Sequence, residues 1–153
     1  MANLNFDESL VCVLDQPGSF ADVEASLANV LRSQGYVKDS FAEAIATREQ
    51  SYPTALQFGE YNIAMPHCDV EHVVNGAICV GVLKEPVAWH RMDDPEATCD
   101  VRLVVMLAIN EAHAHLEMLQ KVVKLLQSQG LVGQIVASST AAEAYPLIAE
   151  QLV

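Results

Sequence analysis

The sequence of 153 residues carries 20 acidic and 8 basic side chains, which gives a net charge of -12. This charge argues against a nucleic-acid-binding protein, because no cluster of Lys and Arg is available to replace the counterions of a phosphate backbone. It favours partners with basic surfaces. The hydrophobic fraction of 52% excludes a disordered chain. The length fits one domain, residues 1–153, with a core of its own.

Membrane and secretion signals are absent from the sequence pattern. The longest apolar stretch, Val101–Ile109, contains Arg102 and reaches about half the length of a membrane span. The start of the chain, Met1–Asp7, has neither the basic residues nor the apolar run of a signal peptide. We therefore expect a cytoplasmic protein. Its four cysteines, which show no CxxC spacing, are expected to be reduced: Cys12, Cys68, Cys79 and Cys99.

The first predicted elements are a short strand and a helix. Leu10–Leu14 is apolar and predicts a short strand or an apolar anchor. Ser19 stands three residues before Asp22, which resembles a capping box at the start of a helix. Gly35 is the residue expected just beyond the end of this helix.

A second helix and a short strand follow. Ser40 with Glu43 repeats the capping pattern and predicts a helix to about Gln50, which Pro53 ends. Ile63–Met65 is then predicted as a short strand that leads into Pro66 and His67.

Three apolar runs in the centre of the chain predict further strands. Ala77–Leu83 is rich in β-formers, and Val87–Trp89 is a candidate to pair with it. Val101–Ile109 is almost continuously apolar, as is typical of a strand that is covered on both faces.

The remaining part of the chain is predicted to be helical. Asn110 is the expected cap of a third helix and Gly130 its end, while Thr140 with Glu143 caps a last helix that contains Pro146. Apolar residues follow helical spacing in the third helix: Leu116, Leu119, Val122, Val123 and Leu126. Helices at both ends around a run of strands predict an α/β sandwich with a mixed central sheet.

His67 is the residue with the clearest chemical potential. Pro66 restricts its own φ angle and holds Met65 extended, so the backbone that enters His67 is stiff. An imidazole with a pKa of about 6.5 is largely neutral near pH 7 and can accept a phosphoryl group and release it again. An ordinary loop histidine fits the same pattern, and the residues alone leave both interpretations open.

A phosphorylated histidine would need groups that receive its charge. Candidates are the backbone N–H groups of Cys68 and Asp69, the guanidinium of Arg48, and His115 in the first turn of the third helix. Arg48 at the end of a helix could equally complement the helix dipole. His113 and His115 could be plain polar residues at a helix start.

Two other chemistries use the same residues. A metal site would combine several histidines with Cys68, but His113 and His115 are two residues apart and face different sides of a helix. A nucleophilic pair of Cys68 with a histidine lacks an orienting third group. The histidines considered for metal are His67, His72, His113 and His115. Neither a Walker loop nor a GxGxxG motif occurs, so we expect no nucleotide and no other cofactor.

Several segments resemble a known family. Arg48-Glu49, Tyr52-Pro53-Thr54 and Ile63-Ala64-Met65-Pro66-His67 are similar to the RE pair, the PTG-like turn and the IAIPH segment of the fructose/mannitol-type enzyme IIA of the bacterial sugar phosphotransferase system. His115-Leu116-Glu117-Met118-Leu119 resembles the family's HLxxL helix start. The resemblance runs from about Leu10 to the C-terminus, and the galactitol-type branch is the most similar.

The resemblance implies a role for each matched residue. His67 would accept a phosphoryl group from the histidine-containing phosphocarrier protein and pass it to a cysteine of a cognate enzyme IIB, which serves a membrane enzyme IIC. His115 would position the group, Arg48 would contact the phosphate, and Thr54 would lie in a substrate-binding turn.

Two departures from the family pattern concern the sugar branch. Ala55 stands where the family often has Gly, and Cys68 stands where it often has Gly or Thr. The resemblance as a whole implies a carrier for uptake of a sugar alcohol, with galactitol as the first candidate. A regulatory phospho-acceptor of the same family is the alternative.

Overall fold

The structure is a computed structural model that describes residues 4–153. The first three residues of the predicted domain 1–153 lie outside the described residues. The five strands are β1 (Val11–Leu14), β2 (Ala55–Leu56), β3 (Asn62–Ala64), β4 (Ala77–His90) and β5 (Thr98–Ala108). The five α-helices are α1 (Phe20–Ser33), α2 (Phe41–Ser51), α3 (Ala114–Gln127), α4 (Gln129–Ala137) and α5 (Ala141–Leu152). Two short 3-10 helices cover Glu8–Leu10 and Val70–His72.

The strands form one mixed sheet in the order β1-β4-β5-β3-β2. β1 runs parallel to β4, and β3 runs parallel to β5. The pairs β4–β5 and β2–β3 are antiparallel. The predicted α/β fold with a mixed central sheet is therefore confirmed.

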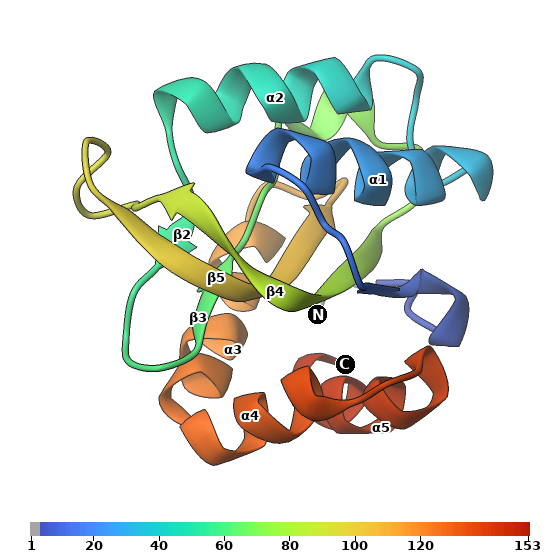
Figure 1. Cartoon of the computed structure of the whole chain (residues 1–153). Coiled ribbons are helices and arrows are strands. Elements are labelled where there is room, and N and C mark those ends of the chain that lie inside the picture. Colours follow the sequence, from blue (N-terminus) through green and yellow to red (C-terminus); the bar gives the residue numbers. More distant parts are fainter. Residues whose placement is uncertain (1–3) are drawn as a thin grey trace.

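Helices cover both faces of the sheet. In Figure 1, α1 and α2 lie above it and α3, α4 and α5 lie below it. Each layer has its own apolar core, and the residues of β5 alternate between them: Val104 packs toward α1 and α2, whereas Val105 packs toward α3 to α5. This alternation explains why the strand reads as continuously apolar in the sequence.

The central strand β4 differs from the expectation for residues 77–89. Val87–Trp89 does not pair with Ala77–Leu83, because both segments belong to β4 and pair with β5. The register shifts between Val82 and Val87. Such an irregularity accommodates Pro86, which has no N–H group for the ladder, without ending the strand.

The first two helices begin at the predicted serines with different caps. Ser19 and Asp22 form the full capping box at the start of α1, and Gly35 adopts a positive φ of 83° after its end. At α2 the Ser40 hydroxyl is bonded to His72 Nδ1 at 2.8 Å, so the expected capping box with Glu43 is not formed.

The third helix starts later and ends earlier than predicted. It begins at Ala114, with His113 rather than Asn110 at the cap position. Gly130 does not end it but lies inside a separate helix, α4, which the sequence analysis missed. Gln129 explains the break, because its side chain donates to the carbonyl of Leu126 at 2.7 Å and to the carbonyl of Tyr61 at 2.9 Å. The Thr140 cap of α5 is confirmed.

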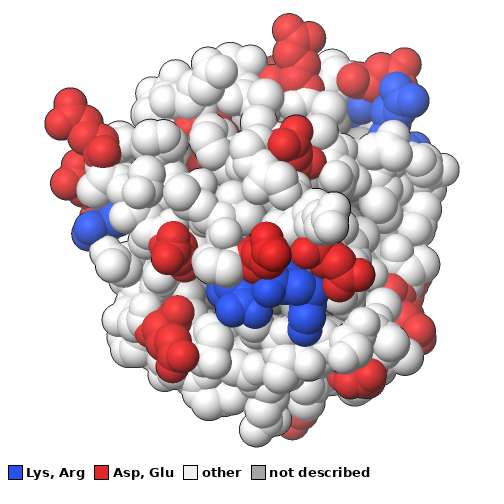
Figure 2. All heavy atoms as spheres, viewed as in Figure 1, with Lys and Arg blue, Asp and Glu red and all other residues white. Residues whose placement is uncertain are grey.

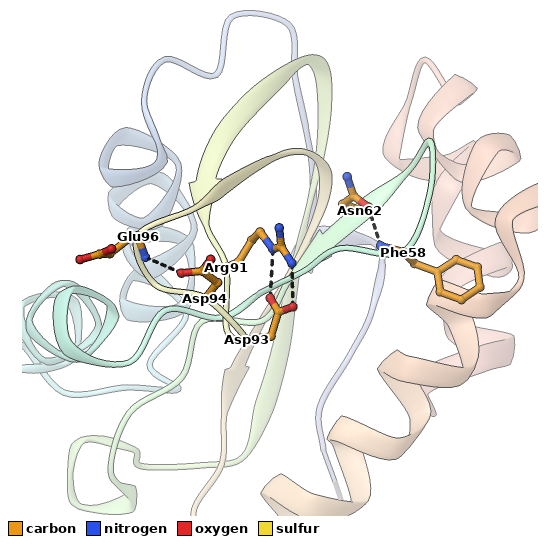
Figure 3. Close-up of polar contacts among 6 residues, drawn as sticks. All are labelled: Phe58, Asn62, Arg91, Asp93, Asp94 and Glu96. Atoms are coloured by element: carbon orange, nitrogen blue, oxygen red, sulfur yellow. Dashed lines mark hydrogen bonds and ion pairs between the residues drawn. The ribbon is translucent and has the colours of Figure 1, made fainter.

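Local polar contacts shape the two loops in Figure 3. In the turn between β4 and β5, Arg91 donates two hydrogen bonds to Asp93, at 3.0 and 2.7 Å. In the turn before β3, Asn62 Oδ1 accepts from the N–H of Phe58 at 2.9 Å. These contacts fix both loops from within.

The acidic composition is visible at the surface. Figure 2 shows acidic side chains scattered over the viewed face, with a central group of basic side chains that acidic ones flank. Within residues 4–153, no helix is both long enough and apolar enough to cross a membrane.

Candidate functional site

The predicted nucleophile lies just beyond the end of β3. Met65 and Pro66 continue the strand direction, and two hydrogen bonds hold them. The N–H of Met65 donates to the hydroxyl of Thr54 at 3.2 Å, and the carbonyl of Pro66 accepts from the N–H of Leu107 at 2.9 Å. The segment is therefore tied to the turn before β2 on one side and to β5 on the other.

The ring of His67 is oriented by a backbone carbonyl two residues before it in the chain. Nδ1 lies 2.8 Å from the carbonyl oxygen of Met65. A carbonyl only accepts, so Nδ1 carries the proton and Nε2 keeps its lone pair. Burial lowers the pKa of His67, and the charges of His115 and Arg48 lower it further, although the Met65 bond acts in the opposite direction. The ring is thus neutral near pH 7, with a free lone pair on Nε2.

His115 lies beside His67, as the resemblance implied. It occupies the first turn of α3, and the two ring centroids are 5.0 Å apart. Burial lowers the pKa of His115, the Ala112 carbonyl that its ring contacts raises it, and the charge of Arg48 lowers it. Within residues 4–153, its Nε2 atom is buried and has no hydrogen-bond partner. A polar atom buried in this way is suited to an incoming ligand.

Arg48 approaches the same place from the last turn of α2. Its charge affects the pKa of both His67 and His115, and its guanidinium lies 5.1 Å from the centre of the Tyr52 ring. Its Nε atom is buried without a hydrogen-bond partner among the described residues. A cavity of about 440 Å³ adjoins it, lined by Ser40, Glu43, Ala44, Thr47, Arg48, Ser51, Tyr52, Cys68, Asp69 and His72.

Thr54 is placed beneath the site rather than at its surface. Only 2% of it is exposed. Its hydroxyl donates to the carboxylate of Glu49 at 2.9 Å and accepts from the N–H of Met65. The hydroxyl is thus occupied within the protein, and it connects the turn before β2 to the strand that carries His67.

Cys68 and the other histidines do not join in a second reactive centre. Burial raises the pKa of Cys68 to about 12, which keeps the thiol protonated and poorly nucleophilic. His72 is bonded to Ser40, and the side chain of His113 is 76% exposed beside Glu111. Among residues 4–153 no three His, Cys, Asp or Glu side chains are grouped so as to hold a metal ion.

Two buried acids were missed by the sequence analysis. Glu24 and Glu49 lie below the site and are 4% and 5% exposed. The sequence indicated Glu49 only as the second residue of the RE pair. The available signal for Glu24 was its position in α1, one residue after Val23 and three before Leu27, at the margin of the apolar stripe.

Comparison with known proteins assigns the chain to a family. Residues 5–151 match the family model described as "Phosphoenolpyruvate-dependent sugar phosphotransferase system, EIIA 2". The chain belongs to this family. The components of this family are phosphotransferase subunits, so membership assigns the chain to phosphotransferase chemistry.

Individual relatives share only a modest part of their sequence with this chain. The galactitol-specific EIIA component of Escherichia coli (strain K12) is 26% identical over 116 residues, which cover 76% of this chain and 77% of that protein. The 2-O-alpha-mannosyl-D-glycerate-specific EIIABC component of the same strain is 36% identical over 105 residues, 67% of this chain and 15% of the larger protein. A solved complex of enzyme IIA for mannitol with phosphorylated enzyme IIB from E. coli matches with a TM-score of 0.77 and 21% identity, covering 97% of this chain and 99% of that chain. The last match supports the fold.

Proposed function

We propose that this enzyme IIA carries a phosphoryl group on Nε2 of His67. The observation that supports this most directly is the hydrogen bond from Nδ1 to the Met65 carbonyl, because it leaves the lone pair of Nε2 free. The ring is neutral near pH 7, as a nucleophile requires.

The proposed transfer has two steps. The Nε2 lone pair attacks phosphorus on the phosphorylated histidine of the histidine-containing phosphocarrier protein. An N–P bond forms on His67 while the donor's N–P bond breaks and returns its electron pair to the donor ring. A cysteine thiolate of enzyme IIB then attacks the same phosphorus, so that an S–P bond forms and Nε2 recovers its electron pair.

His115 and Arg48 would stabilise the charge that arrives with the phosphoryl group. The buried Nε2 atom of His115 can take up a proton once a negative group lies beside it, because a neighbouring anion raises the pKa of an imidazole. It would then donate to a phosphoryl oxygen. The guanidinium of Arg48 offers planar, paired donors to the same oxygens.

The partners follow from the same proposal. Exposed apolar side chains lie next to the site residues in the chain: Tyr52 is 65% exposed, Val70 36% and Leu116 62%. We expect the phosphocarrier protein and enzyme IIB to dock around them in the cytoplasm, with enzyme IIC served through enzyme IIB. A sugar alcohol is the proposed cargo, and galactitol is favoured by the galactitol-specific relative.

The direct test is phosphorylation with purified components. Incubation with enzyme I, the phosphocarrier protein and labelled phosphoenolpyruvate is expected to add one acid-labile phosphoryl group. The variant His67→Ala should take up no label, whereas His113→Ala, which changes an exposed histidine, should label normally. Label on His67→Ala at the wild-type level would contradict the proposal.

A second experiment distinguishes a role in transport from a regulatory role. The phosphorylated protein is mixed with enzyme IIB proteins for galactitol and for mannitol, and the transfer rates are compared. Fast transfer to the galactitol protein supports the proposed cargo. A protein that is phosphorylated but delivers to neither enzyme IIB would favour the regulatory alternative.

A further inference from the structure

Two carboxyl groups are buried together below the site. Glu24 of α1 is hydrogen-bonded to Glu49 of α2, and both side chains are almost fully buried. Two carboxyl groups can form this bond only if one of them holds a proton. No Lys or Arg of the described residues forms an ion pair with either acid, so a shared proton is what removes one of the two charges.

The surrounding donors indicate which acid keeps the charge. Glu49 accepts from the N–H of Thr54 at 2.7 Å, from its hydroxyl at 2.9 Å, and from the indole N–H of Trp89 at 3.1 Å. In contrast, no N–H or hydroxyl of residues 4–153 reaches Oε2 of Glu24. Three donors stabilise an anion, so Glu49 is the carboxylate and Glu24 is the acid that donates to it.

The titration behaviour agrees with this assignment. Burial raises the pKa of Glu24 to about 9, and the charge of Glu49 adds to the effect. Burial also raises the pKa of Glu49, but the hydrogen bonds from Glu24, Thr54 and Trp89 act in the opposite direction and favour its charged form. The groups that act on the pair come from three elements: Glu24 from α1, Glu49 with the following Thr54 turn from α2, and the uncharged indole of Trp89 from β4. Each acid is therefore the other's titratable neighbour.

A continuous chain of hydrogen bonds leads from this pair to the reactive ring. Glu49 accepts from the Thr54 hydroxyl, whose oxygen accepts from the N–H of Met65 at 3.2 Å. The carbonyl of the same Met65 accepts from Nδ1 of His67 at 2.8 Å. Both polar groups of Met65 are thus engaged, one toward the buried acids and the other toward His67.

We propose that Glu24 is a positioning residue: by donating its proton to Glu49, it holds the Thr54–Met65 chain that orients His67. This role rests on the proposed function of His67. It also assigns Thr54 to positioning, because its buried hydroxyl completes the chain. The acids touch no reacting atom, so their removal should slow transfer without changing the affinity for the donor.

The test compares three variants with the wild-type protein. Glu24→Leu keeps the side chain's approximate size but cannot donate, whereas Glu24→Gln keeps a donor through its amide. Glu150→Gln changes an exposed acid of α5 and serves as the matched control. The transfer rate is measured at saturating phosphorylated phosphocarrier protein, and KM is measured separately. Exchange of the Met65 amide hydrogen is followed by NMR and compared with that of Val105.

We expect Glu24→Leu to transfer about tenfold more slowly with an unchanged KM, and its Met65 amide to exchange at least tenfold faster than in the wild type. Glu24→Gln and Glu150→Gln should stay within twofold of the wild type in transfer rate and KM, and neither should exchange the Met65 amide faster than the wild type. A Glu24→Leu protein with normal transfer and normal exchange would overturn the proposal. If Glu24→Leu does not fold, Thr54→Val should show the same defects and Thr54→Ser should restore both.

Carboxyl titration by carbon NMR provides a readout that does not depend on phosphorylation. Glu24 should remain protonated at pH 7 in the wild type, and the resonance of Glu49 should shift in Glu24→Leu. Ionisation of both acids below pH 6 would overturn the shared proton. If the wild-type protein accepts no phosphoryl group, the proposed function fails, while the exchange and titration measurements still decide the role of Glu24.

Discussion

The two helical layers of this protein both pack on the sheet through apolar side chains, but they differ in their buried acids. The layer of α1 and α2 contains both buried acids of the described residues, Glu24 and Glu49. The layer of α3 to α5 packs on the sheet through side chains such as Leu125 and Ile135, which are fully buried and apolar. His67 follows β3 at the border, with Arg48 supplied by one layer and His115 by the other. Both layers pack on the sheet through apolar cores, and we infer that the first layer adds a contribution that depends on a buried proton.

The largest effect on stability is expected in the layer of α3 to α5, which contains no buried acid among the described residues. Leu125 of α3 is completely buried, and Leu125→Ala leaves a cavity that the helices cannot fill, so we expect a loss of about 2–5 kcal/mol. The loss should be the same at pH 5 and pH 8, because nothing in the contact titrates. Chemical denaturation at both pH values measures it.

Leu116→Ala is the control for this comparison, because its side chain is exposed in the same helix and should change stability by less than about 0.5 kcal/mol. A pH-dependent loss in Leu125→Ala would show that the two layers are not separable in this way.

The next largest effect is predicted for the transfer rate when His115 of α3 is replaced. His115→Ala should still accept the phosphoryl group on His67 but pass it on about a hundredfold more slowly, since a lost donor to developing charge costs roughly 3 kcal/mol. Single-turnover transfer to enzyme IIB measures this. An unchanged rate would show that His115 is only a polar residue at the helix start. An equally large effect of His113→Ala would show that His113, and not His115, positions the phosphoryl group.

The stability contributed by the layer of α1 and α2, which contains Glu24 and Glu49, is predicted to depend on pH. The pKa of Glu24 in the folded protein is about 9, above its ordinary value of 4.5. The folded protein therefore keeps a proton that the unfolded chain releases, and the wild type should lose stability as the pH rises from about 4.5 toward 9. Glu24→Gln has no proton to lose there.

Relative to the wild type, Glu24→Gln should accordingly gain roughly 1–3 kcal/mol between pH 4 and pH 8. Denaturation midpoints across this range measure the gain. Parallel pH profiles of the two proteins would contradict the assignment of the shared proton to Glu24.

The smallest effect on stability is expected for Arg48→Lys. If Arg48 only complemented the end of α2, lysine would serve equally, because the dipole needs a positive charge and contributes about 0.3–1 kcal/mol. At a phosphoryl site lysine lacks the planar pair of donors, so transfer should fall about tenfold while the melting temperature stays within a degree or two. Normal transfer by a stable Arg48→Lys protein would remove Arg48 from the site.

The prediction of local structure from sequence succeeded where short-range chemistry decides. Ser19 with Asp22 and Thr140 begin helices as expected, because capping depends on residues within one turn. β5 was recognised from its apolar run. The errors occurred where distant groups compete. Ser40 gave up its capping role to bond His72, and Gln129 used the carbonyl of Tyr61, 68 residues away, to start α4.

At the site, three features could be predicted from residue order alone: the stiff Met65-Pro66-His67 segment, the motifs that led to Arg48 and His115, and the family. Those features depend on covalent geometry and on residue order. Three other features required the folded chain: the free nitrogen of His67, the protonated thiol of Cys68, and the contact of Glu24 with Glu49. These depend on burial and on the approach of α1, α2 and β3, whose residues are tens of positions apart in the chain, and no local pattern encodes that approach.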